Sequence, residues 1–336
     1  MEIFSMEIFS MGIFSMGILP ESISSMCKKF LTYEQQTEHL QSKGLCIPDK
    51  QNAITTLEQI GYFPLIGAYK KVFLHKPSGQ FLYGVTFDEI VCFYKFDEEL
   101  RTLFLKYILH VERCMKSLIS YYFCAKHGEK QSEYLNPANF NAAKKNLNAV
   151  NRLLASLAKT ISGPAHHNYI GHYAKKYQNV PLWVTMNAIT FGQLSAFYQY
   201  MSNDLQVKVS RHFSCCSEKQ LHQFLSITAK CRNVCAHGER LYDFQTSGTI
   251  PDTLLHDKLS ISMRGGSYTA GKHDLFAVVI ALRYLLPNEE FKTFKNSLRK
   301  FAKKVLQECP HITRQQLLRE MGFPENWDKI CSYKIS

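Results

Sequence analysis

Residues 88–126 read DEIVCFYKFDEELRTLFLKYILHVERCMKSLISYYFCAK and carry the strongest helical pattern in the sequence. Apolar side chains recur along this stretch at steps of three and four residues, which is typical of a helix with one buried face. The apolar positions are Phe93, Phe96, Leu100, Leu103, Phe104, Tyr107, Ile108, Val111, Cys114, Met115, Leu118, Ile119 and Tyr122. The stretch therefore predicts one long helix, whose polar face we expect to be mostly solvated.

Two shorter helices are expected before the long one, at residues 32–43 and 49–61. The first opens with Thr32 followed three residues later by Gln35, which is the pattern of a capping box. The second carries apolar residues on one face and ends at a glycine, which is a common helix stop.

Residues 62–69 are aromatic and interrupted by proline and glycine, so we expect an extended segment there. Basic side chains follow among aromatic rings, a mixture found both in strands with a solvated face and in sites for single-stranded bases. They are Lys70, Lys71, His75 and Lys76, and the solvated strand is the favoured interpretation. Residues 26–87 are thus expected to form a small N-terminal helical and aromatic subdomain.

A further series of helices is predicted beyond the long one. Their expected ranges are 139–161, 181–200, 208–211, 221–237, 274–286, 289–306 and 313–321. Residues 241–271 hold several glycines and a proline and are expected to form a loop. With roughly eight to ten helices and little strand, the predicted fold class is mainly α.

The composition narrows the class of protein. The chain has 336 residues, 46% of them hydrophobic, which is enough for a continuous core. Its 40 Lys and Arg exceed its 28 Asp and Glu, so its net charge of +12 attracts polyanions such as nucleic acid. The 11 cysteines are an odd number and form no Cys-x-x-Cys pair, which favours reduced core residues in a cytoplasmic protein.

Residues 1–20 are a tandem five-residue repeat that begins Met-Glu-Ile-Phe-Ser. Its acidic and serine residues do not fit a secretory signal, and a period of five produces no apolar stripe on a helix. We expect a disordered tail over residues 1–25 and a true start near Met26. The sequence contains no run of 18 or more apolar residues, so no membrane-spanning helix is expected.

The motif at residues 231–240, CRNVCAHGER, is the main candidate for chemistry. The apolar run before it predicts a helix, and Gly238 is a natural place for that helix to stop. Arg232 and His237 would then lie about a turn apart at the helix end and point to similar sides. A permanent guanidinium beside a titratable imidazole is a place where a phosphate could bind.

Cleavage of RNA without a metal needs a base for the 2′-hydroxyl, an acid for the 5′-oxygen and positive charge for the transition state. Arg232 and His237 cover two of these roles. One histidine cannot easily be both acid and base, so a second copy of the motif would complete the site in a homodimer. Long-helix residues His110, Glu112 and Lys116 matter only if that helix borders Arg232.

Two other interpretations of the motif are open. In a purely structural one, Arg232 caps carbonyls at the helix end or pairs with Glu239. In the other, Cys231, Cys235 and His237 bind a metal, but a further ligand pair at zinc spacing is missing and Cys231 falls on the apolar face.

The Arg-Asn-x-x-x-His pattern, set within Cys-Arg-Asn-Val-Cys-Ala-His-Gly-Glu-Arg-Leu-Tyr-Asp-Phe, resembles the signature of HEPN ribonucleases and in particular the Abi (abortive infection, AbiD/AbiF-like) family. Other blocks along the chain are similar to blocks of that family, in the same order. These blocks lie at residues 30–36, 60–63, 93–101, 111–113, 181–184 and 321–327.

The resemblance implies a HEPN-type helical bundle over residues 88–336 and a metal-independent endoribonuclease, toxin-like, that acts in phage defence without a cofactor. Arg232 would bind the phosphate, His237 would be the general acid or base, and Asn233 would orient them. The alternative function is a catalytically inactive RNA-binding protein that associates with a small non-coding RNA.

Contacts with RNA are further expected from basic side chains outside the motif. These are Lys144, Lys145, Arg152, Lys175, Lys176, Lys295 and Arg299. The sequence thus predicts RNA as the partner, a homodimer as the assembly and no membrane association.

Overall fold

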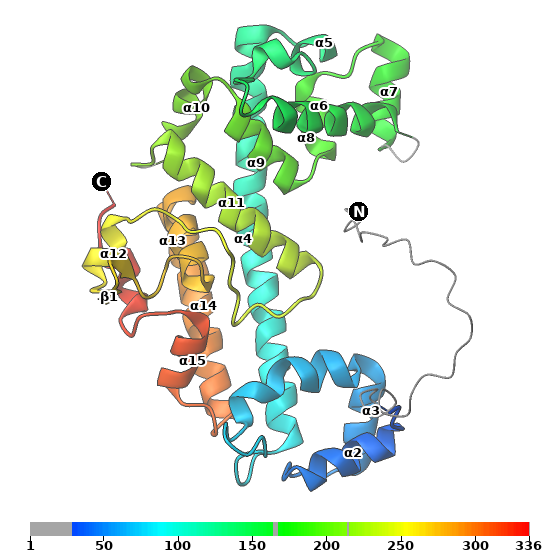
Figure 1. The fold of residues 1–336 in the computed structure, drawn as a ribbon, viewed down its shortest axis with the longest axis vertical. Coiled ribbons are helices and arrows are strands. Elements are labelled where there is room, and N and C mark those ends of the chain that lie inside the picture. The colour runs from blue at the N-terminus through cyan, green and yellow to red at the C-terminus, as the bar shows by residue number, and fades with distance from the viewer. Residues whose placement is uncertain (1–28, 164–166, 214, 336) are drawn as a thin grey trace, which may run out of the picture.

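A single long helix organises the molecule (Figure 1). The structure is a computed structural model that describes residues 29–163, 167–213 and 215–335. Helix α4 (Phe87–His127) has 41 residues and runs along the longest axis of the molecule, over about 60 Å at 1.5 Å per residue. Thr86 and Glu89 form a capping box at its start, and Gly128 follows its last residue with a positive φ.

The predicted apolar stripe of α4 is buried almost throughout. Ten of its members, from Phe93 to Ile119, are less than 9% exposed, and Leu118 and Tyr122 are partly buried. Cys114 is the exception, because it lies on the exposed side of the helix. The expectation of core cysteines is therefore wrong for Cys114, and also for Cys46 and Cys215, which are exposed.

The two N-terminal helices lie at one end of α4, in the blue part of Figure 1. They are α2 (Tyr33–Ser42) and α3 (Lys50–Ile60), and both predictions are confirmed. Thr32 and Gln35 form the expected capping box, while Asp49 accepts a hydrogen bond from the backbone N–H of Asn52.

Residues 62–69 are helical, so the predicted extended segment is wrong. A π-helix, η1 (Phe63–Gly67), is followed by a 3₁₀-helix, η2 (Lys70–Phe73). Pro64 is tolerated because it lies in the first turn of this helix, where backbone N–H groups have no acceptor within the helix. Leu65 and Ile66, adjacent in sequence, are both fully buried, which a surface strand would not allow. The strand predicted after Lys70 is reduced to one bridge between Leu74 and Phe81.

At the other end of α4 the chain forms a group of short helices (Figure 1). They are α5 (Gln131–Tyr134), η3 (Pro137–Asn139), α6 (Leu147–Ser162), α7 (Asn168–Tyr177), α8 (Leu182–Ala188), α9 (Phe191–Tyr200) and α10 (Asn203–Ser210). Their apolar faces meet the upper part of α4, where Phe123, Phe140 and Phe197 pack ring against ring.

Two predicted helices of this group have different boundaries. The helix expected from residue 139 begins at Leu147, because the backbone of Phe140 is extended and pairs with Met201. The helix expected over 181–200 is two helices, since Ile189 is extended and Thr190 starts a new capping box with Gln193.

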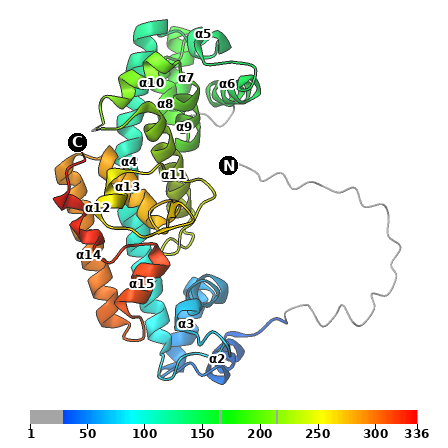
Figure 2. The same cartoon turned by 60° about the vertical axis from the view of Figure 1, so that its left-hand side comes forward.

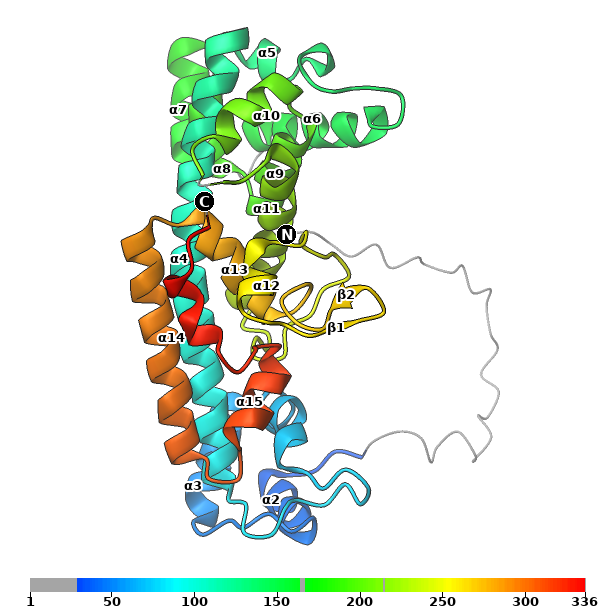
Figure 3. The same cartoon turned by 90° about the vertical axis from the view of Figure 1, so that its left-hand side faces the viewer.

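The rest of the chain returns along α4. It forms α11 (Glu218–Ala236), α12 (Leu254–Lys258), β1 (Met263–Arg264), β2 (Ser267–Tyr268), α13 (Leu275–Leu285), α14 (Asn288–Glu308), α15 (Arg314–Met321) and η4 (Trp327–Ser332). Figure 2 and Figure 3 show α14 alongside the lower half of α4, and Figure 3 shows α12 and the two-stranded hairpin on the opposite side of α13. Every residue of α13 is buried, so it is the most enclosed of these helices.

The described part of the chain is mainly α, as predicted, with β1 and β2 as its two short strands. Within that part, no helix combines the length and the apolar composition needed to cross a membrane. The predicted tail over residues 1–25 lies outside the described residues. The predicted boundary between an N-terminal subdomain ending at residue 87 and a helical bundle beginning at residue 88 stays a prediction.

Candidate functional site

Helix α11 ends at the motif in a defined geometry. His237 is the C-cap residue, and Gly238 follows with φ of 69°. The N–H of Glu239 bonds the carbonyl of Val234, and the N–H of Gly238 bonds that of Cys235. This pair of bonds is a Schellman motif, which requires a left-handed residue and so favours glycine. The predicted stop at Gly238 is confirmed.

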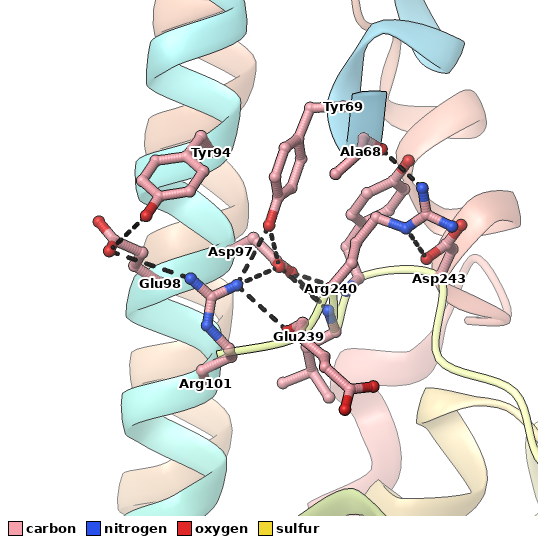
Figure 4. Close-up of polar contacts among 11 residues, drawn as sticks. Ala68, Tyr69, Tyr94, Asp97, Glu98, Arg101, Glu239, Arg240 and Asp243 are labelled. Carbon is pink, nitrogen blue, oxygen red and sulfur yellow. Dashed lines mark hydrogen bonds and ion pairs between the residues drawn. The ribbon is translucent and has the colours of Figure 1, made fainter. Parts of the chain in front are cut away.

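The chain just after the motif is fixed by one buried carboxylate, Asp97 of α4 (Figure 4). Asp97 accepts hydrogen bonds from the backbone N–H groups of Leu241, at 3.0 Å, and Tyr242, at 2.7 Å. It also accepts from the hydroxyl of Tyr69, at 2.7 Å, and from Nη1 of Arg101, at 2.6 Å. We call these five residues the Asp97 anchor.

The Asp97 anchor is enclosed, and both oxygens of its carboxylate are hydrogen-bonded, whereas the hydroxyl of Tyr242 is buried without a hydrogen-bond partner. The side chain of Asp97 is 0% exposed, and that of Arg101 is 9% exposed. Burial raises the pKa of Asp97, while its contacts with Leu241, Tyr69, Arg101 and Tyr242 lower it. All four partners donate to the carboxylate, an arrangement that favours its charged form.

Further contacts hold the same segment. Nη1 of Arg101 donates to the carbonyl of Glu239, and Arg240 joins Asp243 to the carbonyl of Ala68 (Figure 4). The segment after α11 is thus fastened both to α4 and to the end of η1. The position of His237 is set by α11 on one side and by the Asp97 anchor on the other.

Arg232 lies on the side of α11 that faces α4. Its Nε is 3.9 Å from Oε2 of Glu112, and the side chain is 30% exposed. Oε1 of Glu112 pairs with Lys116 Nζ at 2.8 Å, and Lys116 also donates to the carbonyl of Ile189. We call Arg232, Glu112 and Lys116 the Arg232 cluster. Arg232 therefore meets Glu112 rather than Glu239, so the predicted structural pairing is wrong.

The Arg232 cluster contains polar atoms that lack a hydrogen bond. Among the described residues, Arg232 Nε and Glu112 Oε2 are both buried without a hydrogen-bond partner. Their 3.9 Å separation permits Coulombic attraction but is too long for a hydrogen bond. Buried polar groups without a hydrogen bond cost free energy. The ion pair of the Arg232 cluster makes no hydrogen bond, whereas the carboxylate of the Asp97 anchor makes several.

Asn233 and His237 differ from Arg232 in their surroundings. Both are exposed to solvent. Five residues separate Arg232 from His237, which corresponds to about 140° around a helix axis. The expectation that their side chains point to similar sides is therefore not met within one chain, where Arg232 faces α4 and His237 faces solvent.

A family model described as Abi-like protein matches residues 55–243. The matched range begins within α3 and ends at Asp243, the residue that pairs with Arg240. The chain belongs to the Abi-like protein family. This membership associates it with abortive infection, a bacterial defence against phage. No curated protein and no solved structure matches the chain.

The matched range places the Asp97 anchor and the Arg232 cluster of this Abi-like protein inside the family region. The sequence did not single out Asp97 or Arg101, whose i, i+4 spacing is the signal that could have suggested a pair. Three residues of the long helix were expected to matter only if that helix borders Arg232. The helix does border it, and Glu112 and Lys116 lie at the contact. His110 instead pairs with Glu290 of α14.

The cysteines of the motif lie in the core of the Abi-like protein. Cys231 is 0% and Cys235 is 7% exposed. Burial raises the pKa of Cys231, and the adjoining Cys235 thiol raises it further, so a metal-binding thiolate is disfavoured. Within residues 29–163, 167–213 and 215–335, no group of three or more His, Cys, Asp or Glu side chains is placed to bind a metal ion.

The predicted RNA-binding side chains fall into two separate groups. Lys144, Lys145, Arg152, Lys175 and Lys176 are exposed on α6, α7 and the turn before α6. Lys295 and Arg299 lie on α14, along the other half of α4, with Lys295 partly buried and Arg299 exposed (Figures 1 and 3).

Proposed function

We propose that this Abi-like protein is a metal-independent endoribonuclease with a HEPN-type bundle over residues 88–336, acting as a toxin in abortive infection. The observation that supports this best is the partly exposed guanidinium of Arg232, on the same helix end as the exposed His237 although the two side chains face different sides within one chain. A phosphate could bind the exposed part of this guanidinium.

In the proposed reaction the 2′-hydroxyl oxygen of the RNA attacks the adjacent phosphorus, and the bond from phosphorus to the 5′-oxygen breaks. One histidine takes the proton of the 2′-hydroxyl, and a second gives a proton to the leaving 5′-oxygen. Arg232 neutralises the charge that develops on the phosphoryl oxygens. The products are a 2′,3′-cyclic phosphate and a 5′-hydroxyl.

The need for two histidines argues for two chains. Each copy supplies one His237, exposed at the end of α11, so an isologous contact at this helix end would bring two together. In such a dimer each Arg232 would stand across from the partner's motif. Asn233, exposed beside Arg232, would orient the phosphate or the histidine of the other copy.

Glu112 and Lys116 are positioning residues in this proposal. Glu112 attracts the guanidinium of Arg232 and pairs with Lys116, so it sets where both cations lie. Because Glu112 is only 7% exposed and rigidly mounted on α4, the cations are held before RNA arrives. Preorganised charge of this kind needs little rearrangement during the reaction.

The test compares RNA cleavage by the wild type with Arg232→Ala and His237→Ala. We expect kcat/KM to fall about 10²- to 10³-fold for Arg232→Ala and about 10²- to 10⁴-fold for His237→Ala, with cyclic phosphate at the product ends of the wild type. Lys219→Ala, an exposed cation at the opposite end of α11, is the matched control and should cleave normally.

Two further measurements complete the test. Activity should persist in EDTA, and the rate should rise more steeply than linearly with protein concentration while the dimer forms. Tight, salt-sensitive RNA binding without cleavage would instead favour the inactive RNA-binding protein. Equal cleavage by the wild type and the two motif variants would contradict the proposed active site.

A further inference from the structure

A groove of about 660 Å³ lies between α4 and α8. Residues Arg113, Lys116 and Tyr121 line it from α4, and Trp183 and Asn187 line it from α8. Small side chains such as Ser117 and Ser120 form part of its floor. The groove belongs to neither the Asp97 anchor nor the α11 end.

Two large aromatic side chains of the groove are open to solvent. Trp183 is 46% exposed and Tyr121 is 68% exposed, whereas Trp327, the other tryptophan of the chain, is 4% exposed. Trp183 and Asn187 are four residues apart on α8 and so lie on the same side of that helix. A flat aromatic face beside an amide is suited to stacking on a nucleobase and bonding its edge.

The charge of the groove is positive. Among the described residues that line it, the charged ones are Arg113 and Lys116, and Lys116 pairs with Glu112 just outside the lining. A polyanion fits this lining better than an acidic or neutral peptide would. An exposed aromatic surface with cations beside it is the combination that binds single strands, because bases stack on the rings while phosphates meet the cations.

The groove adjoins the Arg232 cluster through Lys116. Its Nζ is 2.8 Å from Glu112, whose other oxygen faces Arg232, and Lys116 also lines the groove. Along α4 the distance from Glu112 to Lys116 is one helical turn, about 6 Å. This is close to the spacing between neighbouring phosphates of an extended strand, so a nucleotide next to the scissile phosphate could reach the groove.

We propose that this groove binds an unpaired base of single-stranded RNA, stacked on Trp183, next to the phosphate bound by Arg232. The inference rests on the proposed ribonuclease function, because Arg232 supplies the neighbouring phosphate position. Tyr121 adds a second aromatic surface, and Arg113 with Lys116 binds the backbone. The site selects single strands, because paired bases inside a duplex cannot stack on a side chain.

The experiment uses tryptophan fluorescence of the full chain with His237→Ala, which prevents cleavage during the titration. The probes are a six-nucleotide oligouridylate and a strand of the same length without bases. We expect the oligouridylate to quench Trp183 and to bind more tightly than the abasic strand. Trp327 supplies a constant background because it is buried.

Substitution of Trp183 gives the decisive comparison. With dye-labelled strands and binding followed by fluorescence anisotropy of the dye, Trp183→Ala should weaken oligouridylate binding about five- to a hundredfold, as expected for the loss of one stacked base, and leave the abasic strand unaffected. Trp183→Phe should retain most of the affinity. Tyr177→Ala, at an exposed aromatic of α7, is the matched control and should bind as the parent does. Circular dichroism checks the fold of each variant.

Equal weakening for both probes, or no quenching, would overturn the base site. A loss of dimer on Trp183→Ala with unchanged RNA binding would mean that the groove is a contact between two copies, and would also overturn it. The two proposals fail separately. Base-dependent quenching without any cleavage by the wild type contradicts only the ribonuclease, whereas His237-dependent cleavage with an unchanged KM in Trp183→Ala contradicts only the groove.

Discussion

Helix α4 carries two charged clusters, one at the last turns of α11 and one at the segment that follows α11, and they are built in opposite ways. In the Asp97 anchor, a fully buried carboxylate receives four donors, and every distance is within hydrogen-bond range. In the Arg232 cluster, the closest contact between Arg232 and Glu112 is 3.9 Å, and both atoms are buried without a hydrogen bond.

This difference in hydrogen bonding suggests a structural role for the Asp97 anchor and a functional role for the Arg232 cluster. A satisfied buried network fixes geometry and has no capacity left for a ligand. A buried ion pair without a hydrogen bond costs stability, and a ligand that binds the exposed part of the guanidinium would offset part of that cost. The comparison therefore predicts that changes in the Asp97 anchor reduce stability, whereas changes in the Arg232 cluster alter RNA binding and cleavage.

Removal of the anchoring carboxylate should have the largest effect on folding. Asp97→Ala leaves Arg101 and two backbone N–H groups buried without their acceptor. We expect the free energy of unfolding to fall by about 3–5 kcal/mol, measured by urea denaturation.

The matched control for Asp97 is its neighbour on the same helix. Glu98 is 48% exposed and lies 4.0 Å from Arg101, so Glu98→Ala should change stability by less than about 1 kcal/mol. If Asp97→Ala were no more destabilising than Glu98→Ala, the anchor would not have the structural role assigned to it.

Asp274, a second buried carboxylate, sharpens the comparison because it forms no ion pair within the described part of the chain. It caps α13 and accepts from the backbone N–H groups of Gly271 and Ala277. Burial raises its pKa to about 6. A raised carboxyl pKa means that the group favours the folded state below about pH 4 and that this contribution is lost as the pH rises to 6.

Asp274→Asn keeps a capping side chain but cannot ionise. Relative to the wild type, its free energy of unfolding should rise by about 2 kcal/mol between pH 4 and pH 6, measured by denaturation at each pH. Parallel stability curves for the two proteins would show that Asp274 keeps its ordinary pKa. Asp204→Asn, at an exposed carboxylate whose pKa is lowered by Lys126, should not show the rise.

The smallest effect is expected at Glu112. Glu112→Gln removes a negative charge near the phosphate site and should tighten RNA binding by about 1 kcal/mol, or roughly fivefold. It also frees Arg232 and Lys116, so kcat should fall by about tenfold while KM falls too. Filter binding and single-turnover cleavage would measure the two effects. Unchanged binding together with unchanged cleavage would contradict the positioning role.

Local signals predicted much of the fold. The limits of α2, α3 and α4 follow from capping boxes, glycine stops and the period of apolar residues, all of which act within a few residues. The break at Thr190 was also readable, because Thr190 and Gln193 form the capping box that opens α9. The helix expected from residue 139 failed for another reason: Phe140 is held in an extended conformation by Met201, which lies 61 positions further along the chain.

The candidate site shows the same limit. The motif itself, its helix and its glycine stop are visible in the sequence, Arg232 and His237 follow from their chemistry and spacing, and the resemblance to the Abi family supports the same residues. The partners of Arg232 could be named only conditionally, and Asp97, Trp183 and the groove could not be assigned at all. Each depends on which face of α4 meets α8, α11 or the segment after α11, and no local pattern specifies that pairing.

The sequence by itself determined a mainly α chain with one dominant helix and one motif of arginine, asparagine and histidine at a helix end. Only the tertiary structure decided that Arg232 faces Glu112 and Lys116 and that His237 faces solvent. It also decided that a buried carboxylate, 144 residues away from Leu241, fixes the chain just after His237. The physical reason is the distance along the chain over which each kind of interaction acts. Capping and periodicity act over one or two turns, whereas burial and charge pairing depend on packing between distant segments.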